Sequence, residues 1–218
     1  MGKNVKPVFG YFSGKLGLTY GRMVHGVNLV NAMPSQTSNP RTSLQMDNRE
    51  RFKTLAQLAS AFLAPSKIGL KNKAKQYGPL VTVFDAFMKA NQGAVSVMGG
   101  EAEVDYGSIK CSIGTLPQVG FGNASFAEPQ RITVTYSTSA DMPGSDAQDK
   151  VYMFIYQPDT KQGILSAPAL RTTGNMDVRV PASWTGLTCH VFGFALGDGR
   201  ENKGKNSDSS YIGTGIIG

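Results

Sequence analysis

The sequence predicts an α+β protein in which a basic N-terminal arm and a helical hairpin precede a β-sandwich of the immunoglobulin or fibronectin type III kind. Three observations predict this. Residues 1–41 are rich in Gly, Asn, Ser and Pro and have no periodic apolar face, residues 42–99 contain two amphipathic segments, and residues 100–218 contain short strand-like runs between turn clusters. The expected domains are therefore an extended Gly-rich arm (1–41), a helical hairpin (42–99) and a β-sandwich (100–218).

The arm contains a stretch, Phe-Ser-Gly-Lys-Leu-Gly, that looks like a phosphate-binding loop but lacks its spacing. Only three residues separate Gly10 from Gly14, and Leu16 follows Lys15 where a P-loop has Ser or Thr. The residues that follow, with short strands expected on either side of Gly21 and Gly26, favour a ribbon over a helix. We therefore expect no nucleotide or other cofactor. The arm is too poor in apolar residues to offset its own ordering entropy, so it must lie on its own body, lie on another subunit, or stay loose.

The helical hairpin is predicted from capping residues and apolar spacing. Thr42 and Ser43 suit the start of a first helix that Pro65 closes, and Pro79 suits the first turn of a second helix that ends near residues 91–93. A basic hinge is expected between the two helices. The apolar stripe of the first helix consists of Phe52, Leu55, Ala59, Phe62 and Leu63.

The sandwich is predicted from short apolar or alternating runs. Thr188–Ala195 is apolar on both faces, as in a central strand, and Trp184 lies just before it, where we expect it to cap the core. The expected strands are Ser108–Ile113, Arg131–Thr138, Lys150–Gln157, Met176–Val180, Leu187–Leu196 and Tyr211–Ile217.

The formal net charge of +7 is unevenly distributed. Residues 1–75 hold twelve Lys and Arg but only two acidic residues, a net charge of +10, whereas the remainder carries −3. This asymmetry indicates that the basic part contacts nucleic acid, an acidic partner chain, or the acidic sandwich edge of a neighbouring copy. The candidate interaction residues are Lys15, Arg41, Arg49, Arg51, Lys53, Lys67, Lys71, Lys73 and Lys75.

No catalytic or metal-binding pattern is present in the sequence. The two Cys and two His are too few and too widely spaced for a structural zinc site. Cys189 and His190 are neighbours in an expected strand, so their side chains point to opposite faces and cannot form a dyad. We expect no enzyme, and we expect His190 to be a hydrogen-bonded structural residue.

Two acidic groups have structural interpretations. Glu101, Glu103 and Asp105 alternate, which is typical of a solvated strand edge that discourages pairing. Asp198 and Asp208, with Glu201, lie in a hydrophilic loop that lacks EF-hand spacing. The C-terminal Gly-x-Gly-x-x-Gly has no helix after it, so a dinucleotide site is not expected there.

The sequence also bears on localisation. No run of about 18 apolar residues is present, so we expect no membrane span. The N-terminus lacks the continuous apolar stretch of a secretory signal, so we expect a cytoplasmic protein, or one carried out in a particle.

The order of short motifs resembles a functionally uncharacterised family of proteins of similar length from Bacteroidetes and their phages. The motifs are Phe12-Ser-Gly-Lys-x-Gly17, Arg41-Thr-x-x-Gln45, Arg51-Phe52, Asp105-Tyr106, Ser112-x-Gly-x-Leu116, Asp149-Lys150, Ile155-Tyr-Gln-Pro158, Val180-Pro181, Trp184-x-Gly186 and Ser207-Asp-Ser-Ser-Tyr211. The resemblance covers nearly the whole chain and implies no catalytic residues.

These observations favour a non-enzymatic structural or assembly protein. The expectation is a bacteriophage virion component, such as a capsid accessory protein or a tail or neck ring subunit, made in the host cytoplasm and contacting other copies of itself and other virion proteins. One alternative is a nucleic-acid-binding protein that uses the basic residues 41–75. Another is a glycan-binding sandwich, for which exposed aromatic residues on a sandwich face would be the distinguishing feature.

Overall fold

The computed structural model describes residues 13–34, 41–138, 144–199 and 202–218, in two units, Met1–Thr42 and Ser43–Gly218. In the first unit, β1 (Gly14–Leu16), β2 (Thr19–Val24) and β3 (Val27–Ala32) form an antiparallel sheet in that order. The expected break at Gly26 is confirmed, because His25 (φ 49°) and Gly26 (φ 77°) supply the two left-handed residues of a tight hairpin. Gly21, by contrast, lies inside β2. Lys15 lies in a strand that is followed by another strand, so the strand–loop–helix context of a P-loop is absent here.

The second unit begins with four helices rather than the expected two. These are α1 (Ser43–Ala61), α2 (Leu63–Gly69), α3 (Lys71–Tyr77) and α4 (Val83–Ala90). The prediction of a basic hinge was wrong, because Pro65 does not end the helical region. It lies in the first turn of a new helix, where the N–H group that proline lacks would have no helical partner. The second predicted helix begins at Val83 rather than Pro79, since Thr82 and Asp85 form a capping box.

The apolar stripe of α1 is only partly buried. Leu55, Ala59 and Phe62 have exposed fractions of 4%, 1% and 0%, but Phe52 is 64% exposed. The N-terminal half of α1 therefore extends beyond the core.

A short hairpin and two sheets complete the second unit. The hairpin pairs β4 (Val95–Met98) with β5 (Glu101–Val104). The larger sheet has the order β10 (Ala169–Leu170), β8 (Lys150–Gln157), β12 (Thr188–Leu196), β13 (Ser210–Ile216), with β9 (Gln162–Leu165) also paired to β8. The smaller sheet has the order β11 (Asn175–Arg179), β7 (Arg131–Tyr136), β6 (Phe121–Glu128). All these pairings are antiparallel, which confirms an α+β fold.

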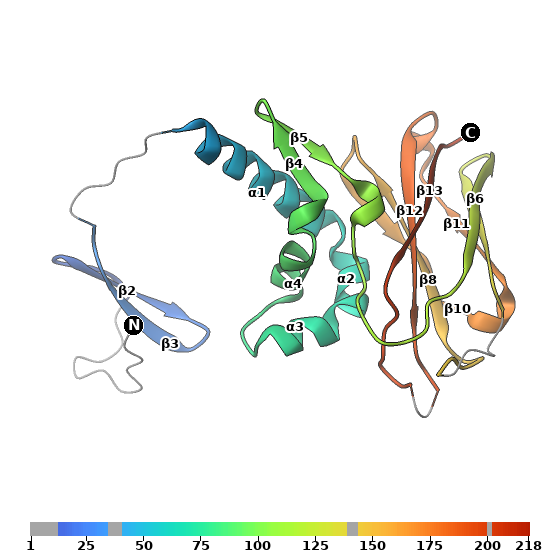
Figure 1. Cartoon of the computed structure of the whole chain (residues 1–218), viewed down its shortest axis with the longest axis horizontal. Helices are drawn as coiled ribbons and strands as arrows, with labels where there is room; N and C mark the ends of the chain where they lie inside the picture. Colours follow the sequence, from blue (N-terminus) through green and yellow to red (C-terminus); the bar gives the residue numbers. More distant parts are fainter. Residues whose placement is uncertain (1–12, 35–40, 139–143, 200–201) are drawn as a thin grey trace. The chain divides into compact units, whose positions relative to one another are not determined.

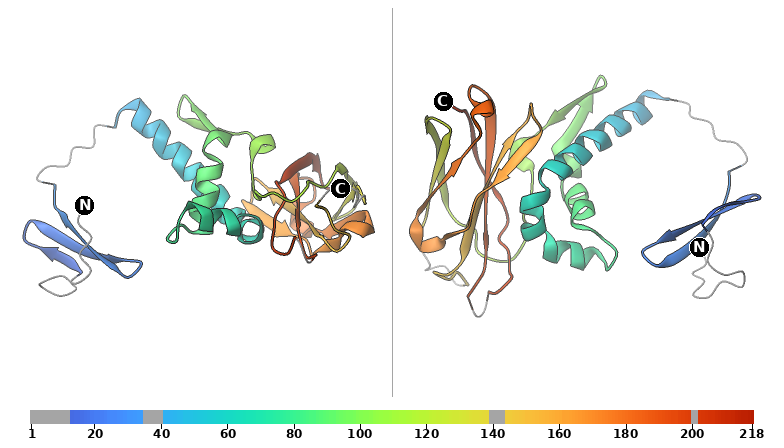
Figure 2. Two further views of the ribbon diagram at one scale, coloured as in Figure 1. Left: turned by 60° about the horizontal axis from the view of Figure 1, so that its bottom comes forward. Right: turned by 180° about the vertical axis from the view of Figure 1, so that it is seen from behind.

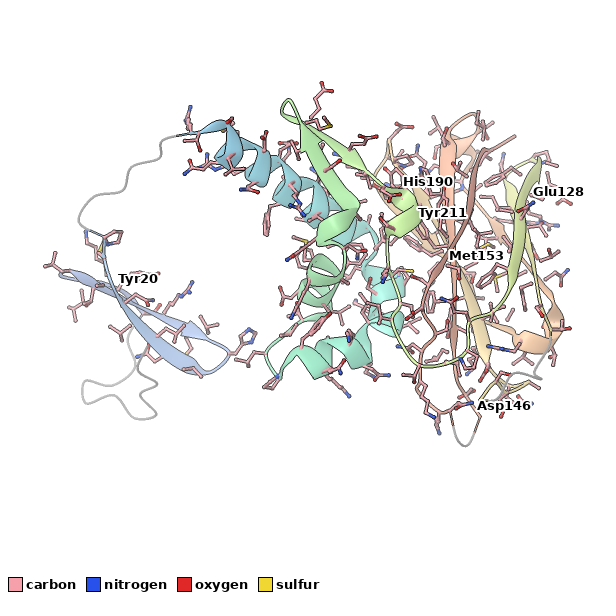
Figure 3. All side chains as sticks on the ribbon, in the orientation of Figure 1. Tyr20, Glu128, Asp146, Met153, His190 and Tyr211 are labelled. Atoms are coloured by element: carbon pink, nitrogen blue, oxygen red, sulfur yellow. The ribbon has the colours of Figure 1, made fainter. Side chains whose placement is uncertain are left out.

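The second unit has three layers. The helices cover one face of the five-stranded sheet, and the three-stranded sheet lies against the other face (Figures 1 and 2). β8 shows the division, because Tyr152 and Phe154 point into the helical core while Val151 and Met153 point between the sheets (Met153 is labelled in Figure 3). The central strand expected at Thr188–Ala195 is confirmed as β12.

The expectations for Trp184 and for the strand Ser108–Ile113 have different outcomes. Trp184 is 1% exposed and belongs to the core between the sheets, as predicted. Ser108–Ile113 is not a strand: it follows a short 3-10 helix (Tyr106–Ser108) and continues as a buried connecting segment. Its apolar residues face the helical core, which is why the segment resembles a buried strand in sequence.

Candidate interaction surfaces

Several of the short sequence motifs meet where the helical layer joins the larger sheet. Ser112 Oγ donates a hydrogen bond to the Ser207 carbonyl at 2.6 Å, and Asn206 Nδ2 donates to the Gly69 carbonyl at 2.9 Å. Asn206 also accepts a backbone hydrogen bond from Leu116 at 2.9 Å. We call Gly69, Ser112, Gly114, Asn206 and Ser207 the polar hub. Because it ties three distant parts of the chain together, its residues have structural roles.

Two glycines of the polar hub are required by close packing. A Cβ atom at Gly69 would lie 2.5 Å from the Ser112 Cβ, and one at Gly114 would overlap the Asn206 carbonyl oxygen. Neither space can accommodate a side chain without moving the backbone. The glycine in Ser112-x-Gly-x-Leu116 is therefore explained by layer packing rather than by chemistry.

Three of the predicted lysines form one row on the surface beside the hub. Lys67, Lys71 and Lys75 follow one another at intervals of four residues along α2 and α3, and the helical hydrogen bonding continues through Leu70. All three are exposed, and they line a pocket of about 340 Å³ that also includes Asn72. The helical path, unlike the predicted hinge, places their charges on one side.

Lys73 and Lys205 extend this positive surface. They line an adjoining pocket of about 410 Å³ together with Asn72 and Thr115. In the part of the chain that the structure describes, none of these lysines makes an ion pair with a carboxylate. We call Lys67, Lys71, Lys73, Lys75 and Lys205 the lysine surface. Several like charges without a paired carboxylate raise the local positive potential at this surface.

The remaining predicted basic residues lie elsewhere. Lys15 and Arg41 are exposed residues of the first unit. On α1, Arg51 donates to the Gln92 carbonyl, and Lys53 forms an ion pair with Glu50 at 3.0 Å, while Arg49 is exposed. Sequence reasoning missed Lys205, because only the folded chain brings the loop before β13 next to α3.

An aromatic pocket lies beside β5 on the larger sheet. The Tyr106 ring stacks on the His190 imidazole with centroids 3.8 Å apart, and His190 Nδ1 lies 3.0 Å from the Tyr211 hydroxyl (Figure 3). With Glu103 and Asp105 they line about 570 Å³. Burial lowers the pKa of His190 and, with smaller contributions from Tyr106 and Asp159, raises that of Tyr156 to about 12. His190 is therefore a partnered neutral imidazole near pH 7.

Neither cysteine has the chemistry of a nucleophile. Both are buried free thiols, and burial raises the pKa of Cys111 to about 12 and that of Cys189 to about 11. Cys189 lies in the core between the sheets, on the opposite face from His190, as the strand geometry predicts.

Described acidic residues of the candidate calcium loop have other partners. Asp198 forms an ion pair with Lys150 at 2.8 Å, and Asp208 accepts a hydrogen bond from the Gly114 N–H at 3.0 Å. Glu201 lies outside the described residues. Over the described ranges, no group of three or more His, Cys, Asp or Glu side chains is arranged to hold a metal ion.

The fold defines the class of this protein: an α+β protein whose described residues form four α-helices and mostly antiparallel sheets. Among its described helices, none has the length and apolar character needed to span a bilayer. The chain belongs to the DUF6266 family, a family of unknown function, whose model matches residues 11–213. This confirms the expectation of an uncharacterised family that covers nearly the whole chain. A search of curated proteins gives no match.

Proposed function

We propose that this protein is a non-enzymatic structural component that functions by assembling through its N-terminal unit. The supporting observation is the exposure of apolar side chains on that unit: Leu16 is 64% exposed, Leu18 83% and Met23 51%. A small sheet that leaves these apolar side chains in water buries little surface to offset its ordering entropy, and it gains stability when another surface covers them. Attachment of such a unit to a packed body is the arrangement expected of a subunit whose arm lies on a neighbour.

The proposed setting is a bacteriophage particle, with the protein as a capsid accessory protein or a tail or neck ring subunit made in the host cytoplasm. Support comes from the resemblance of the motif order to a family of Bacteroidetes and phage proteins. We further infer that the sandwich is of the immunoglobulin or fibronectin type III kind. Its sheet orders, β11-β7-β6 and β9/β10-β8-β12-β13, correspond to strands E-B-A and C′-C-F-G of such domains.

Light scattering coupled to size-exclusion chromatography tests the assembly proposal. The wild-type chain should increase in mass as its concentration rises, and the double variant Leu16→Ser with Leu18→Ser should remain a monomer. Ile216→Ser is the matched control, because this β13 residue has a similar exposed fraction of 63% in the other unit. A wild-type chain that stays monomeric at every concentration, alone or with co-expressed neighbouring gene products, would refute the proposal.

Mass spectrometry of purified particles tests the virion setting. Phage particles from a host that carries the gene should contain the chain in stoichiometric amounts relative to a major structural protein. Particles that form normally and lack the chain would restrict the proposal to assembly outside a virion.

A second candidate function, nucleic-acid binding, is favoured by the lysine surface. Fluorescence anisotropy with duplex DNA should show binding that weakens steeply as salt is raised, since each neutralised phosphate releases counterions. Changing Lys67, Lys71 and Lys75 to Glu should abolish this binding.

The control for that experiment carries the same change of charge at exposed sites outside the lysine surface: Lys110, Lys161 and Arg179 to Glu. Equal losses in both triple variants would show that net charge alone is responsible. For the glycan alternative, the described sandwich faces carry no exposed aromatic residue: Phe52 lies on α1, and the aromatic pocket on the larger sheet is lined by the half-buried Tyr106 and Tyr211.

A further inference from the structure

The outer strand of the N-terminal sheet has an unprotected edge. β3 has the sequence Val-Asn-Leu-Val-Asn-Ala, with no charged residue and no proline over six residues. It pairs with β2 on one side and with no other strand among the described residues. Proteins normally protect such edges with charges, prolines or bulges, because an exposed edge recruits another strand. β3 therefore has the properties of a strand that pairs with a further strand in an assembly.

The second unit offers a free edge on the β4–β5 hairpin. In the described chain these strands pair only with each other. The Asp105 N–H donates to the Ala94 carbonyl at 2.8 Å, and the register then places the N–H groups of Ala102 and Val104 on the side away from β4. β5 can accept a strand at this edge without losing a hydrogen bond of its own.

The two faces of β5 differ in chemistry. Glu101 and Glu103 are exposed on one face, whereas Ala102 and Val104 pack against the helical core on the other. Leu44 on α1 is 70% exposed. It lies seven residues, or about two helical turns, before Arg51, so both side chains are on the side of α1 that contacts the β4–β5 hairpin. An added strand at this edge would therefore extend an acidic face and an apolar face together.

The N-terminal sheet has the complementary pair of faces. The strand register places Lys15 and Arg22, with the half-buried Tyr20, Val24, Val27 and Leu29, on one face, and the exposed Leu16, Met23 and Val30 on the other. Residues 1–42 contain five basic residues and no acidic one. In a continuous sheet the basic face would align with Glu101 and Glu103, and the apolar face would align with the side of β5 that contacts the helices.

We propose that β3 of one copy pairs with the free edge of β5 in a second copy, extending the β4–β5 hairpin into a sheet shared between subunits. This inference rests on the proposed assembly function and names its contact. β13 is also an edge strand, but it has no charged residue to match the basic arm. A contact that joins the arm of each copy to the body of the next is heterologous, so it forms rings or continuous lattices.

Cross-linking between two differently tagged populations tests the contact. One population carries Asn31→Cys on β3 and the other carries Glu103→Cys on β5, and the strand register predicts that both positions lie on the same face of the shared sheet. A short bismaleimide should give heterodimers in the mixture, while the buried native cysteines remain unreactive. The matched control replaces Glu103→Cys by Thr185→Cys, an exposed position on the sandwich.

The outcomes separate this contact from the assembly proposal. Heterodimers with Glu103→Cys and few with Thr185→Cys support the inference. Assembly seen by light scattering without preferential cross-linking at Glu103 overturns the inference and leaves the proposed function standing. A double variant that cross-links only within one chain shows that the arm covers its own body, which overturns the inference.

Two substitutions on β5 make the test specific to strand pairing. Ala102→Pro removes an outward N–H without affecting the bonds to β4, and it should abolish the heterodimer while the circular dichroism spectrum is unchanged. Glu101→Lys added to the Glu103→Cys population should also lower the yield, and Lys15→Glu with Arg22→Glu in the partner population should restore it. Unchanged yields in these variants would overturn the proposal.

Discussion

Replacing Phe62 with alanine tests whether the helices and the sheets form one cooperative unit. The Phe62 ring is fully buried, with its centroid 4.7 Å from that of Phe154, 5.2 Å from that of Phe192 and 5.4 Å from that of Phe87. Phe154 and Phe192 belong to the larger sheet and Phe87 belongs to α4. This one side chain, at the junction of α1 and α2, therefore packs against α4 within the helical layer and against the larger sheet.

The magnitude follows from the volume removed. A buried Phe→Ala substitution costs about 3–5 kcal/mol in free energy of unfolding, because it loses transfer energy and leaves a cavity. For a domain of roughly 150–250 residues each kcal/mol lowers Tm by about 2–4 °C, so the expected decrease in Tm is about 6–20 °C. Phe52→Ala on α1 is the matched control, and its effect should stay within about 0.5 kcal/mol because Phe52 is 64% exposed.

Two probes report on the two parts of the unit during urea unfolding. Far-ultraviolet circular dichroism follows the helices, and the fluorescence of Trp184, the single tryptophan, follows the core between the sheets. Both transitions should move together to lower urea in Phe62→Ala. A shift in the helical signal alone would refute the idea of a single cooperative unit, as would a variant as stable as wild type.

Three further predictions concern buried or crowded groups. Arg171→Ala should lower the free energy of unfolding by about 3–5 kcal/mol, because it leaves the fully buried Asp149 carboxylate without its cation (Nε–Oδ2 3.5 Å). Gly114→Ala should cost about 1–3 kcal/mol, because the new methyl group overlaps the Asn206 carbonyl; urea titration measures both effects. Burial lowers the pKa of His190 in the folded state, so its contribution to stability should be complete above the unfolded pKa of about 6.5 and should decrease as pH falls through that value.

Matched controls exist for each of these predictions. Arg179→Ala, at an exposed arginine, and Gly93→Ala, where no atom lies within 4 Å of the added carbon, should change stability by less than about 0.5 kcal/mol. For the pH effect, thermal melting of His190→Phe between neutral and acidic pH should show a smaller loss of Tm than wild type. If Tm depends on pH equally in His190→Phe and in the wild type, the pH prediction is contradicted. If a variant and its control lose the same free energy of unfolding, the prediction for that variant is contradicted.

The parts of the fold that could be predicted from sequence are those with strong local patterns. β12 is apolar on both faces because it lies between β8 and β13 with a core on each side, and that burial is visible in its composition. Trp184 was placed correctly for the same reason. The failures arose where one local sequence signal fits two structures. Pro65 can end one helix or begin the next, and the packing of Phe62 and Leu70 in the helical core selects the second.

The candidate surfaces depended on contacts that no local pattern contains. The sequence identified Lys67, Lys71 and Lys75 as basic, but their alignment requires the helices that the predicted hinge excluded. Lys205 joins them through the polar hub, whose hydrogen bonds connect residues more than 130 positions apart in the sequence, such as Asn206 and Gly69. Contacts between residues this far apart in the sequence cannot be predicted from the periodicity of local segments.

The helices bury one face of the larger sheet, and this limits which parts of the protein can be removed or modified. Tyr152, Phe154, Phe192 and Phe194 on that face are enclosed by the helices of the same chain. Deleting the helices would uncover a broad aromatic patch and make the remainder prone to aggregation. The three-stranded sheet carries exposed side chains on its outer face, such as Thr135 and Asn175, so a fluorescent label attached there would not disturb the helical layer on the far side of the larger sheet (Figure 1).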